Sequence, residues 1–300
     1  MFALTERRDH LDPAGAALLA VLCLSWGIQQ VSIKLAMIGV SPVMQAGLRS
    51  VIAVTLLYLW MRRRGVPLMG TDGLWKPGLV IGTLFSLEFW LLYWALEFTS
   101  ASRAIIFLYM SPFVVAAGAH LLLPGERLNR LQIAGMVIAF GGIVVVFQGG
   151  LHGPAMAGAW IGDVMAFAAA VFWGLTTLVI RTTSLARAAP SRSLFFQLLV
   201  SACLLPLVSM LQGEPGITAL TPLVIGCLFY QGVIVAFASY LVWFWMIAHY
   251  PVPQLAGFTF LAPVFGVSAG VMLLDEPLSA SLVAGAALVG AGIYIVNRPG

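Results

Sequence analysis

Long apolar segments follow one another along almost the whole chain, and short polar turns separate them. A helix that crosses a membrane needs about 20 consecutive, mainly apolar residues. The turns between the segments are rich in Pro, Gly, Ser and charge, which favours breaks between helices. We therefore predict ten transmembrane helices, at residues 14–37, 42–61, 77–98, 101–122, 130–148, 157–180, 190–211, 222–246, 252–273 and 279–297.

Composition supports an all-α membrane protein. The 300 residues are 61% hydrophobic and only 9% charged, whereas a soluble domain carries about 25% charged residues. The chain has too little polar surface for a water-soluble globule, and its net charge of +4 is no sign of nucleic-acid binding. Its three cysteines all fall in predicted helices, so we expect no disulfide framework. The first apolar segment exceeds the roughly 7–15 residues of a signal-peptide core, so we interpret it as the first membrane helix.

The positions of the cations predict the orientation. If the N-terminus is cytoplasmic, twelve Lys and Arg residues fall on the cytoplasmic side, while the outer side keeps only Lys34 and Arg103. Such an excess of positive charge is typical of cytoplasmic loops. With ten helices, both termini are then predicted to be cytoplasmic.

The two halves of the sequence resemble each other. Residues 26–34 read Trp-Gly-Ile-Gln-Gln-Val-Ser-Ile-Lys, and residues 173–181 read Trp-Gly-Leu-Thr-Thr-Leu-Val-Ile-Arg. Further matches along the two halves are Pro42 with Pro190, Arg49 with Gln197, Trp94 with Trp245, Pro112 with Pro263, Glu126 with Glu276, Gly135 with Gly285 and Gly142 with Gly292. We predict two five-helix repeats, at residues 1–150 and 151–300, that form one integrated membrane domain.

Because five is an odd number, the second repeat should be inverted in the membrane. Equivalent loops should then differ in charge, and they do: residues 126–130 are basic, whereas their counterparts at 275–279 contain no cation. Likewise the arginines at 62–64 correspond to a loop that contains Glu214. A parallel repeat does not predict this change.

The order of these motifs resembles the drug/metabolite transporter superfamily, and within it the EamA-type exporters. The resemblance covers nearly all of the chain, and we judge it closest to the YddG-type exporters of aromatic amino acids. It implies a multi-pass transporter of a bacterial inner membrane that acts on small molecules as a monomer. No cofactor or metal is expected, and enzyme motifs such as a phosphate-binding glycine loop or a Gly-x-Ser-x-Gly elbow are missing from the sequence.

Two ionisable residues lie deep inside predicted helices, Arg49 and Glu88. Arg49 is about seven residues, or about 10 Å, from the end of its helix, and Glu88 lies at a similar depth. The second repeat has Gln197 and Ser239 at these positions, so both charges are absent together. This favours an ion pair between Arg49 and Glu88, and leaves open contact with a zwitterionic substrate or proton coupling through Glu88.

Other polar and aromatic residues could line a substrate pathway. Ser25, Gln29 and Ser32 share one face of the first helix, and Trp173, Thr176 and Thr177 occupy equivalent places in the sixth predicted helix. Spacing also predicts one face for Ser86, Trp90, Tyr93 and Glu97, and aromatic walls from Phe107, Tyr109, Tyr230, Gln231, Phe237, Tyr240, Trp243 and Phe244. The candidate pathway residues are Trp26, Gln29, Arg49, Glu88, Tyr93, Trp173, Thr176, Ser239 and Tyr240. Hydrogen bonding and packing between helices is the alternative for each.

Proline and glycine suggest how the helices bend and pack. Pro112 and Pro263 lie mid-helix at equivalent positions and act either as hinges of alternating gates or as static kinks. The Gly135/Gly142 and Gly285/Gly292 pairs, two helical turns apart, predict close helix packing.

The sequence thus predicts an exporter that moves amino acids, including aromatic ones, from the cytoplasm by alternating access. The alternative within the same fold is an exporter of drug-like organic cations or other small metabolites. An intramembrane enzyme or a structural membrane protein is a third class, which the charge inversion of the loops disfavours.

Overall fold

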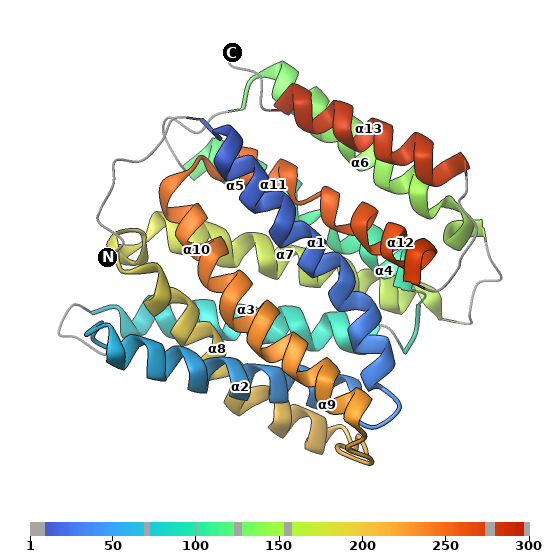
Figure 1. Cartoon of the computed structure of the whole chain (residues 1–300). Coiled ribbons are helices and arrows are strands. Elements are labelled where there is room, and N and C mark those ends of the chain that lie inside the picture. The colour runs from blue at the N-terminus through green and yellow to red at the C-terminus, as the bar shows by residue number, and fades with distance from the viewer. Residues whose placement is uncertain are drawn as a thin grey trace.

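The computed structural model describes residues 10–68, 73–95, 97–99, 101–122, 128–152, 158–273 and 280–296. Every element within them is helical (Figure 1). The first half contains α1 (Pro13–Ala36), α2 (Pro42–Arg63), α3 (Trp75–Ala95), α4 (Ala101–Leu108), α5 (Ser111–Leu122) and α6 (Arg130–His152). The second half contains α7 (Ala159–Thr182), η1 (Ser184–Arg187), α8 (Pro190–Leu211), α9 (Pro222–Phe229), η2 (Tyr230–Ser239), α10 (Tyr240–His249), α11 (Val252–Phe258), α12 (Leu261–Leu273) and α13 (Ala280–Val296).

Six helical stretches in the described residues are long and apolar enough to cross a membrane. They are α1, α2, α3, α7, α8 and the continuous stretch Pro222–His249, and each coincides with a predicted helix. Three of the remaining predicted spans contain the shorter apolar helices Ile106–Leu122, Arg130–Val145 and Val283–Val296, and the ninth predicted span contains α11 and α12. Together these elements make the all-α, ten-span architecture of a polytopic membrane protein, in two inverted five-helix repeats.

The fourth and ninth predicted helices are each broken into two. A turn at residues 109–110 separates α4 from α5, and a turn at 259–260 separates α11 from α12. Pro112 is the second residue of α5, and Pro263 is the third residue of α12. Both prolines therefore lie in the first turn of a helix, where the missing N–H removes no helical hydrogen bond. The predicted mid-helix position was wrong at both sites, and the choice between hinges and static kinks stays a prediction.

One deviation from regular α-helix was not predicted. The long stretch from α9 to α10 contains η2, ten residues of π-helix from Tyr230 to Ser239. Its counterpart in the first half, α3, is α-helical throughout. Wide π-turns are rare and occur frequently at functional sites.

The halves interlock instead of folding side by side. Helix α1 packs against α12 of the other half, α7 packs against α3 and α5, α2 packs against α8, and α6 packs against α13. The last two pairs join equivalent helices, and in Figure 1 α6 and α13 run side by side. Pairing of equivalent helices is what an approximate two-fold relation between repeats requires.

Glycines permit this close packing, as predicted. A Cβ atom on Gly142 would lie 2.7 Å from the carbonyl oxygen of Gly285, and one on Gly135 would lie 2.8 Å from that of Gly292. The glycines of the two Trp-Gly pairs also permit close contact between helices. A Cβ atom on Gly27 would lie 2.6 Å from a backbone nitrogen of α12, and one on Gly174 would lie 2.6 Å from Val114 of α5.

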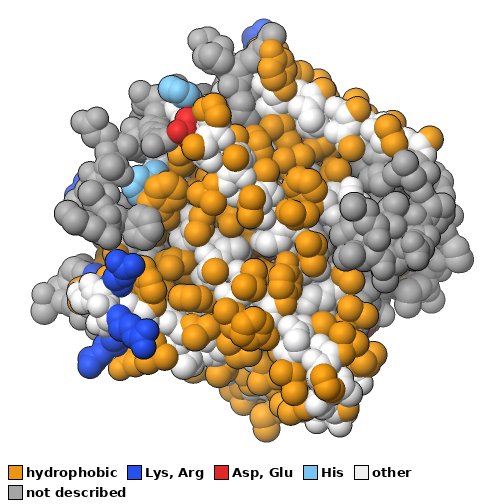
Figure 2. Space-filling model, in the orientation of Figure 1, with side chains coloured by type: hydrophobic (Ala, Val, Ile, Leu, Met, Phe, Trp, Pro, Cys, Tyr) orange, Lys and Arg blue, Asp and Glu red, His pale blue; other side chains and the backbone are white. Residues whose placement is uncertain are grey.

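The molecular surface is apolar over most of the face drawn in Figure 2. Lys and Arg side chains gather at one edge of that face, and large hydrophobic side chains such as Leu121, Trp160 and Met210 are strongly exposed. Such a surface requires lipid around it.

The loop after α8 caps the start of α2. Both carboxylate oxygens of Glu214 accept hydrogen bonds there, Oε1 from Val43 N at 3.1 Å and Oε2 from Met44 N at 3.2 Å. The hydroxyls of Ser41 and Ser209 also donate to Oε2, at 2.9 and 2.6 Å. An anion is favourable at a helix N-terminus, so Glu214 ties the two halves together. Two other loop acids, Glu126 and Glu276, which match each other in the two repeats, lie outside the described residues.

Candidate functional site

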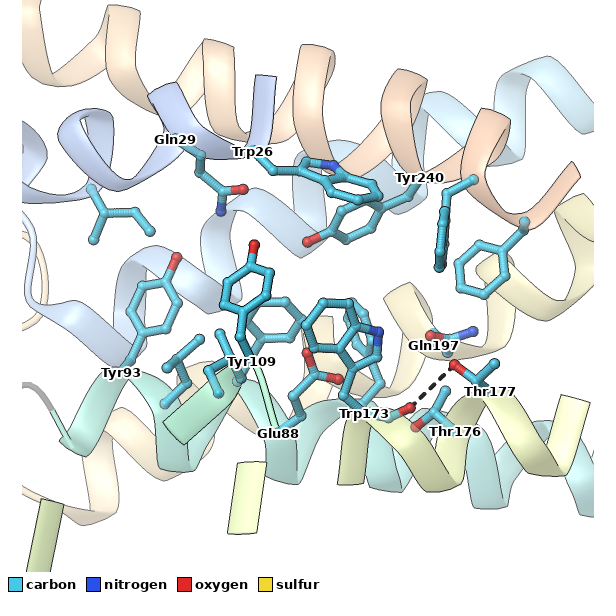
Figure 3. Close-up of a pocket in the computed structure, with 17 residues that line it drawn as sticks. Trp26, Gln29, Glu88, Tyr93, Tyr109, Trp173, Thr176, Thr177, Gln197 and Tyr240 are labelled. Atoms are coloured by element: carbon cyan, nitrogen blue, oxygen red, sulfur yellow. Dashed lines mark hydrogen bonds between the residues drawn. The ribbon is translucent and has the colours of Figure 1, made fainter. Parts of the chain in front are cut away.

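A cavity of about 100 Å³ lies between the two halves (Figure 3). By volume it can hold several water molecules or a small solute. Its polar lining consists of Gln29, Glu88, Thr176, Thr177 and Gln197. Nine aromatic residues also line it: Trp26, Phe85, Phe89, Tyr93, Tyr109, Trp173, Tyr240, Trp243 and Phe244. Ile33, Leu92 and Leu108 complete the wall.

The structure brings together most of the predicted pathway residues. Seven of them line this cavity: Trp26, Gln29, Glu88, Tyr93, Trp173, Thr176 and Tyr240. They come from α1, α3, α7 and α10, so both halves contribute walls. The other two, Arg49 and Ser239, are buried directly behind the lining residues.

Ser239 positions an aromatic wall. The indole N–H of Trp26 donates to Ser239 Oγ at 2.9 Å, and the hydroxyl of Ser239 donates to the carbonyl oxygen of Val235 at 2.7 Å. The Trp26 ring also packs edge-on against Trp243, with 5.4 Å between ring centroids. Because Ser239 belongs to the π-helical segment, this segment fixes the orientation of one cavity wall.

Arg49 stacks on an aromatic ring instead of forming an ion pair. Its guanidinium carbon is 3.8 Å from the ring centroid of Phe89 and 5.9 Å from those of Tyr93 and Tyr240. The side chain is 0% exposed, and none of its three nitrogens has a hydrogen-bond partner in the described residues. A cation over a ring face is attracted by about 2 kcal/mol or more when desolvated.

The predicted ion pair between Arg49 and Glu88 is therefore wrong in its contact geometry. Glu88 and Phe89 are neighbours on α3 and point in directions about 100° apart. Phe89 is the residue that meets Arg49, while Glu88 faces the cavity. The two side chains remain close enough for an electrostatic interaction.

The face of α3 that meets the cavity differs from the predicted one. Of Ser86, Trp90, Tyr93 and Glu97, only Tyr93 lines the cavity. The hydroxyl of Ser86 donates to a backbone carbonyl of its own helix, and the indole of Trp90 donates to Gln212 Oε1 at 3.1 Å. Close packing on α8 fixes this rotation, because a Cβ atom on Gly82 would lie 2.5 Å from Val200.

Several predicted polar residues connect helices instead of facing the cavity. Ser32 donates to the carbonyl of Cys227 at 3.3 Å, and the amide of Gln231 donates to Ser32 and Gln45 at 3.4 and 3.3 Å. The hydroxyl of Tyr230 donates to the backbone oxygen of Ser25 at 2.9 Å. The alternative considered for these residues, hydrogen bonding between helices, is what the structure shows.

Phe85 and Phe89 also line the cavity and were not predicted from the sequence. They lie one turn apart on α3, with 4.7 Å between their ring centroids. A signal was available in the sequence: Phe85 and Phe89 are four residues apart, and Glu88 is three residues after Phe85. This spacing puts the two rings on the side of the helix that carries the buried acid.

Known proteins resemble this chain in both sequence and fold. The sequence profile described as the EamA-like transporter family matches residues 13–148 and again residues 160–298. The chain belongs to the EamA-like transporter family. The double match follows the two halves seen in the structure.

Curated relatives of this EamA-like transporter include two enterobacterial proteins. It is 28% identical over 291 residues to a probable amino-acid metabolite efflux pump of Salmonella typhimurium, covering 93% of this chain and 92% of the relative. It is 26% identical to the protein of the same description in Escherichia coli, with the same coverage. A Bacillus subtilis relative, the uncharacterized transporter YvbV, is 27% identical over 94% of this chain and 91% of its own length.

A protein of known crystal structure has the same fold. It superposes with a TM-score of 0.80 at 22% identity, over 95% of this chain and 96% of the other. Family membership and fold together show a membrane transporter and exclude an enzyme.

Proposed function

We propose that this protein exports amino acids and related metabolites, aromatic ones included, through the cavity between its two halves. The observation that carries the proposal is the cavity itself, which both halves of an EamA-like transporter line with aromatic rings and a few polar groups. Ligand sites commonly combine apolar walls with a small number of placed polar groups. The relatives described as probable amino-acid metabolite efflux pumps support the substrate class.

Aromatic substrates suit these walls. Trp26, Trp173 and Tyr240 present rings to one space (Figure 3), and aromatic pairs gain about 0.5–1.5 kcal/mol beyond the area they bury. Gln29 and Thr176 can hydrogen-bond the polar end of an amino acid. In this proposal Arg49 and Ser239 act from behind the wall, by holding Phe89 and Trp26 in place.

Alternating access would exchange the side on which the cavity opens. The breaks at 109–110 and 259–260 lie at equivalent places in the two halves, next to Pro112 and Pro263. We propose these turns as the hinges. Replacing either proline with alanine should slow exchange, because alanine permits a continuous helix; unchanged exchange in both variants contradicts the hinge role.

The proposed location is a bacterial inner membrane, with both termini in the cytoplasm. The predicted excess of Lys and Arg on that side supports this orientation.

Counterflow in proteoliposomes tests the function. Vesicles loaded with unlabelled L-phenylalanine should accumulate radiolabelled L-phenylalanine only when they contain the protein. L-leucine and L-threonine then define the range of side chains. No flux of any of these amino acids, with protein that is folded in the vesicles, would refute the proposal.

The second candidate is export of amphiphilic organic cations. The observation that favours it is Glu88, a carboxylate in an aromatic cavity. If a cationic dye is transported and amino acids do not compete with it, this candidate replaces the first.

A further inference from the structure

The carboxylate of Glu88 points into the cavity (Figure 3). The residue is only 6% exposed, and it forms no hydrogen bond or ion pair with another described residue. Burying a charge without a partner is costly. Ionisable groups inside membrane segments accordingly mark substrate or ion paths.

In the second half, the residue at the equivalent position has a hydrogen-bond partner within the protein. Ser239 stands in the second half where Glu88 stands in the first, and it accepts the indole N–H of Trp26 at 2.9 Å. Trp173 is the counterpart of Trp26 and lines the cavity together with Glu88. A single indole N–H could satisfy a serine oxygen, but an ionised carboxylate offers about four acceptor positions. The first half therefore keeps acceptor capacity that the second half lacks.

Arg49 does not occupy the acceptor positions of Glu88. Its guanidinium lies on the ring of Phe89 and does not line the cavity, whereas Phe89 does. The cavity thus contains an acidic side chain, and the nearby guanidinium lies behind a ring. A ligand in the cavity meets the carboxyl group of Glu88 directly, and an ammonium group there would favour its ionised form.

The rings around Glu88 also suit a positive ligand. Phe85, Trp173 and Tyr240 line the same cavity, and the face of an aromatic ring attracts a cation within about 6 Å of its centroid. The carboxylate supplies the charge and hydrogen-bond acceptors, while the rings supply apolar contact for the body of the ligand.

We propose that Glu88 is the ammonium-binding residue of the substrate site, and that the ligand is a primary ammonium carried on an apolar or aromatic body. This inference rests on the proposed function for its choice of amino acids. It adds the orientation of the bound substrate: the ammonium group binds at Glu88, and the side chain of the substrate packs among the rings.

Binding of three small probes to the purified protein tests it. L-phenylalanine, phenethylamine and 3-phenylpropionate share one phenylethyl body; phenethylamine lacks the carboxylate, and 3-phenylpropionate lacks the ammonium. Calorimetry at neutral pH should show binding of L-phenylalanine and phenethylamine, with at least about tenfold weaker binding of 3-phenylpropionate. Two results with the unmodified protein would overturn the inference: equal affinity for 3-phenylpropionate and phenethylamine, or no binding of phenethylamine to folded protein.

Glu88→Gln removes the charge and keeps the shape. It should weaken phenethylamine binding at least about tenfold, while Glu97→Gln, which removes the same charge at an exposed position, should leave it unchanged. Unchanged phenethylamine affinity in folded Glu88→Gln contradicts the inference even if amino acids are transported. Conversely, Glu88-dependent phenethylamine binding without amino-acid flux refutes the proposed function and leaves the ammonium site standing.

Discussion

The hydroxyl of Thr99 donates a hydrogen bond to Oδ1 of Asp163 at 2.9 Å, and both residues are buried. Thr99 follows α3, and Asp163 lies in the second turn of α7. A second contact also joins the two halves: the hydroxyl of Tyr250, just after α10, donates to Oδ1 of Asp12, just before α1, at 2.8 Å. Because the repeats are inverted, the end of α3 and the start of α7 lie at the opposite end of the bundle from the end of α10 and the start of α1 (Figure 1).

Removing either hydroxyl should destabilise one end only. A hydrogen bond to a charged group contributes about 1.5–3 kcal/mol, so Thr99→Val and Tyr250→Phe should each lower the melting temperature. If each contact also holds one gate closed, the two variants should shift cavity accessibility toward opposite sides of the membrane. Sided labelling with membrane-impermeant thiol reagents measures this, and a shift in the same direction contradicts the pairing.

Adjacent glycines on α6 offer a matched test of helix packing. Gly142→Ala would place Cβ 2.7 Å from the carbonyl oxygen of Gly285, whereas Gly141→Ala would meet no atom within 4 Å. Overpacking costs about 1–3 kcal/mol, so Gly142→Ala should lower the melting temperature. Gly141→Ala should leave it unchanged or raise it slightly, because alanine favours helix by up to about 1 kcal/mol. Equal melting temperatures for the two variants would exclude a close α6–α13 contact.

Glu214 should matter for stability through its cap on α2. Glu214→Ala removes all four hydrogen bonds of the carboxylate, and we expect a loss of about 1–2 kcal/mol in the free energy of unfolding. Glu214→Gln keeps one acceptor oxygen and should lose less. Chemical denaturation in detergent measures both, and a Glu214→Ala variant as stable as the parent would show that the cap contributes nothing.

Arg49 and Glu88 should be coupled although they do not touch. Glu88→Gln removes the nearby acid that interacts with the buried guanidinium, and Arg49→Gln removes the cation that favours ionisation of Glu88. The double variant should therefore be more stable than the sum of the single losses predicts, by about 1 kcal/mol. Thermal unfolding of the four proteins gives this coupling, and losses that add within about 0.3–0.5 kcal/mol would mean no interaction.

The sequence was sufficient for the repeats, their inversion and the membrane helices, because apolar length and loop charge are local signals. It was also sufficient for the α6–α13 glycines, whose spacing directly reflects a helical face. The rotation of α3 was not predictable from its own pattern, since all of its faces are apolar. Contacts of Gly82 with α8 fix that rotation, and with it the positions of Phe89 and Glu88.

Two other features depend on tertiary contacts and were also missed. The sequence of 230–239 gives no period that distinguishes π-helix from α-helix, yet that segment orients Ser239 toward Trp26. The prolines were correctly identified as sites of change in the helices. Their place in the first turn of α5 and α12 depends on a break that the apolar pattern does not show.

Substrate protection of a cavity residue tests the central claim most directly, namely that solutes cross through the space between the halves. Thr176 lines the cavity and is 4% exposed, and Thr176→Cys changes its volume little. In a background without Cys23, Cys203 and Cys227, we predict that a small thiol reagent labels this cysteine, and that L-phenylalanine slows labelling in proportion to its occupancy of the site. Labelling that proceeds at the same rate with saturating substrate, in protein that still transports it, would contradict the account.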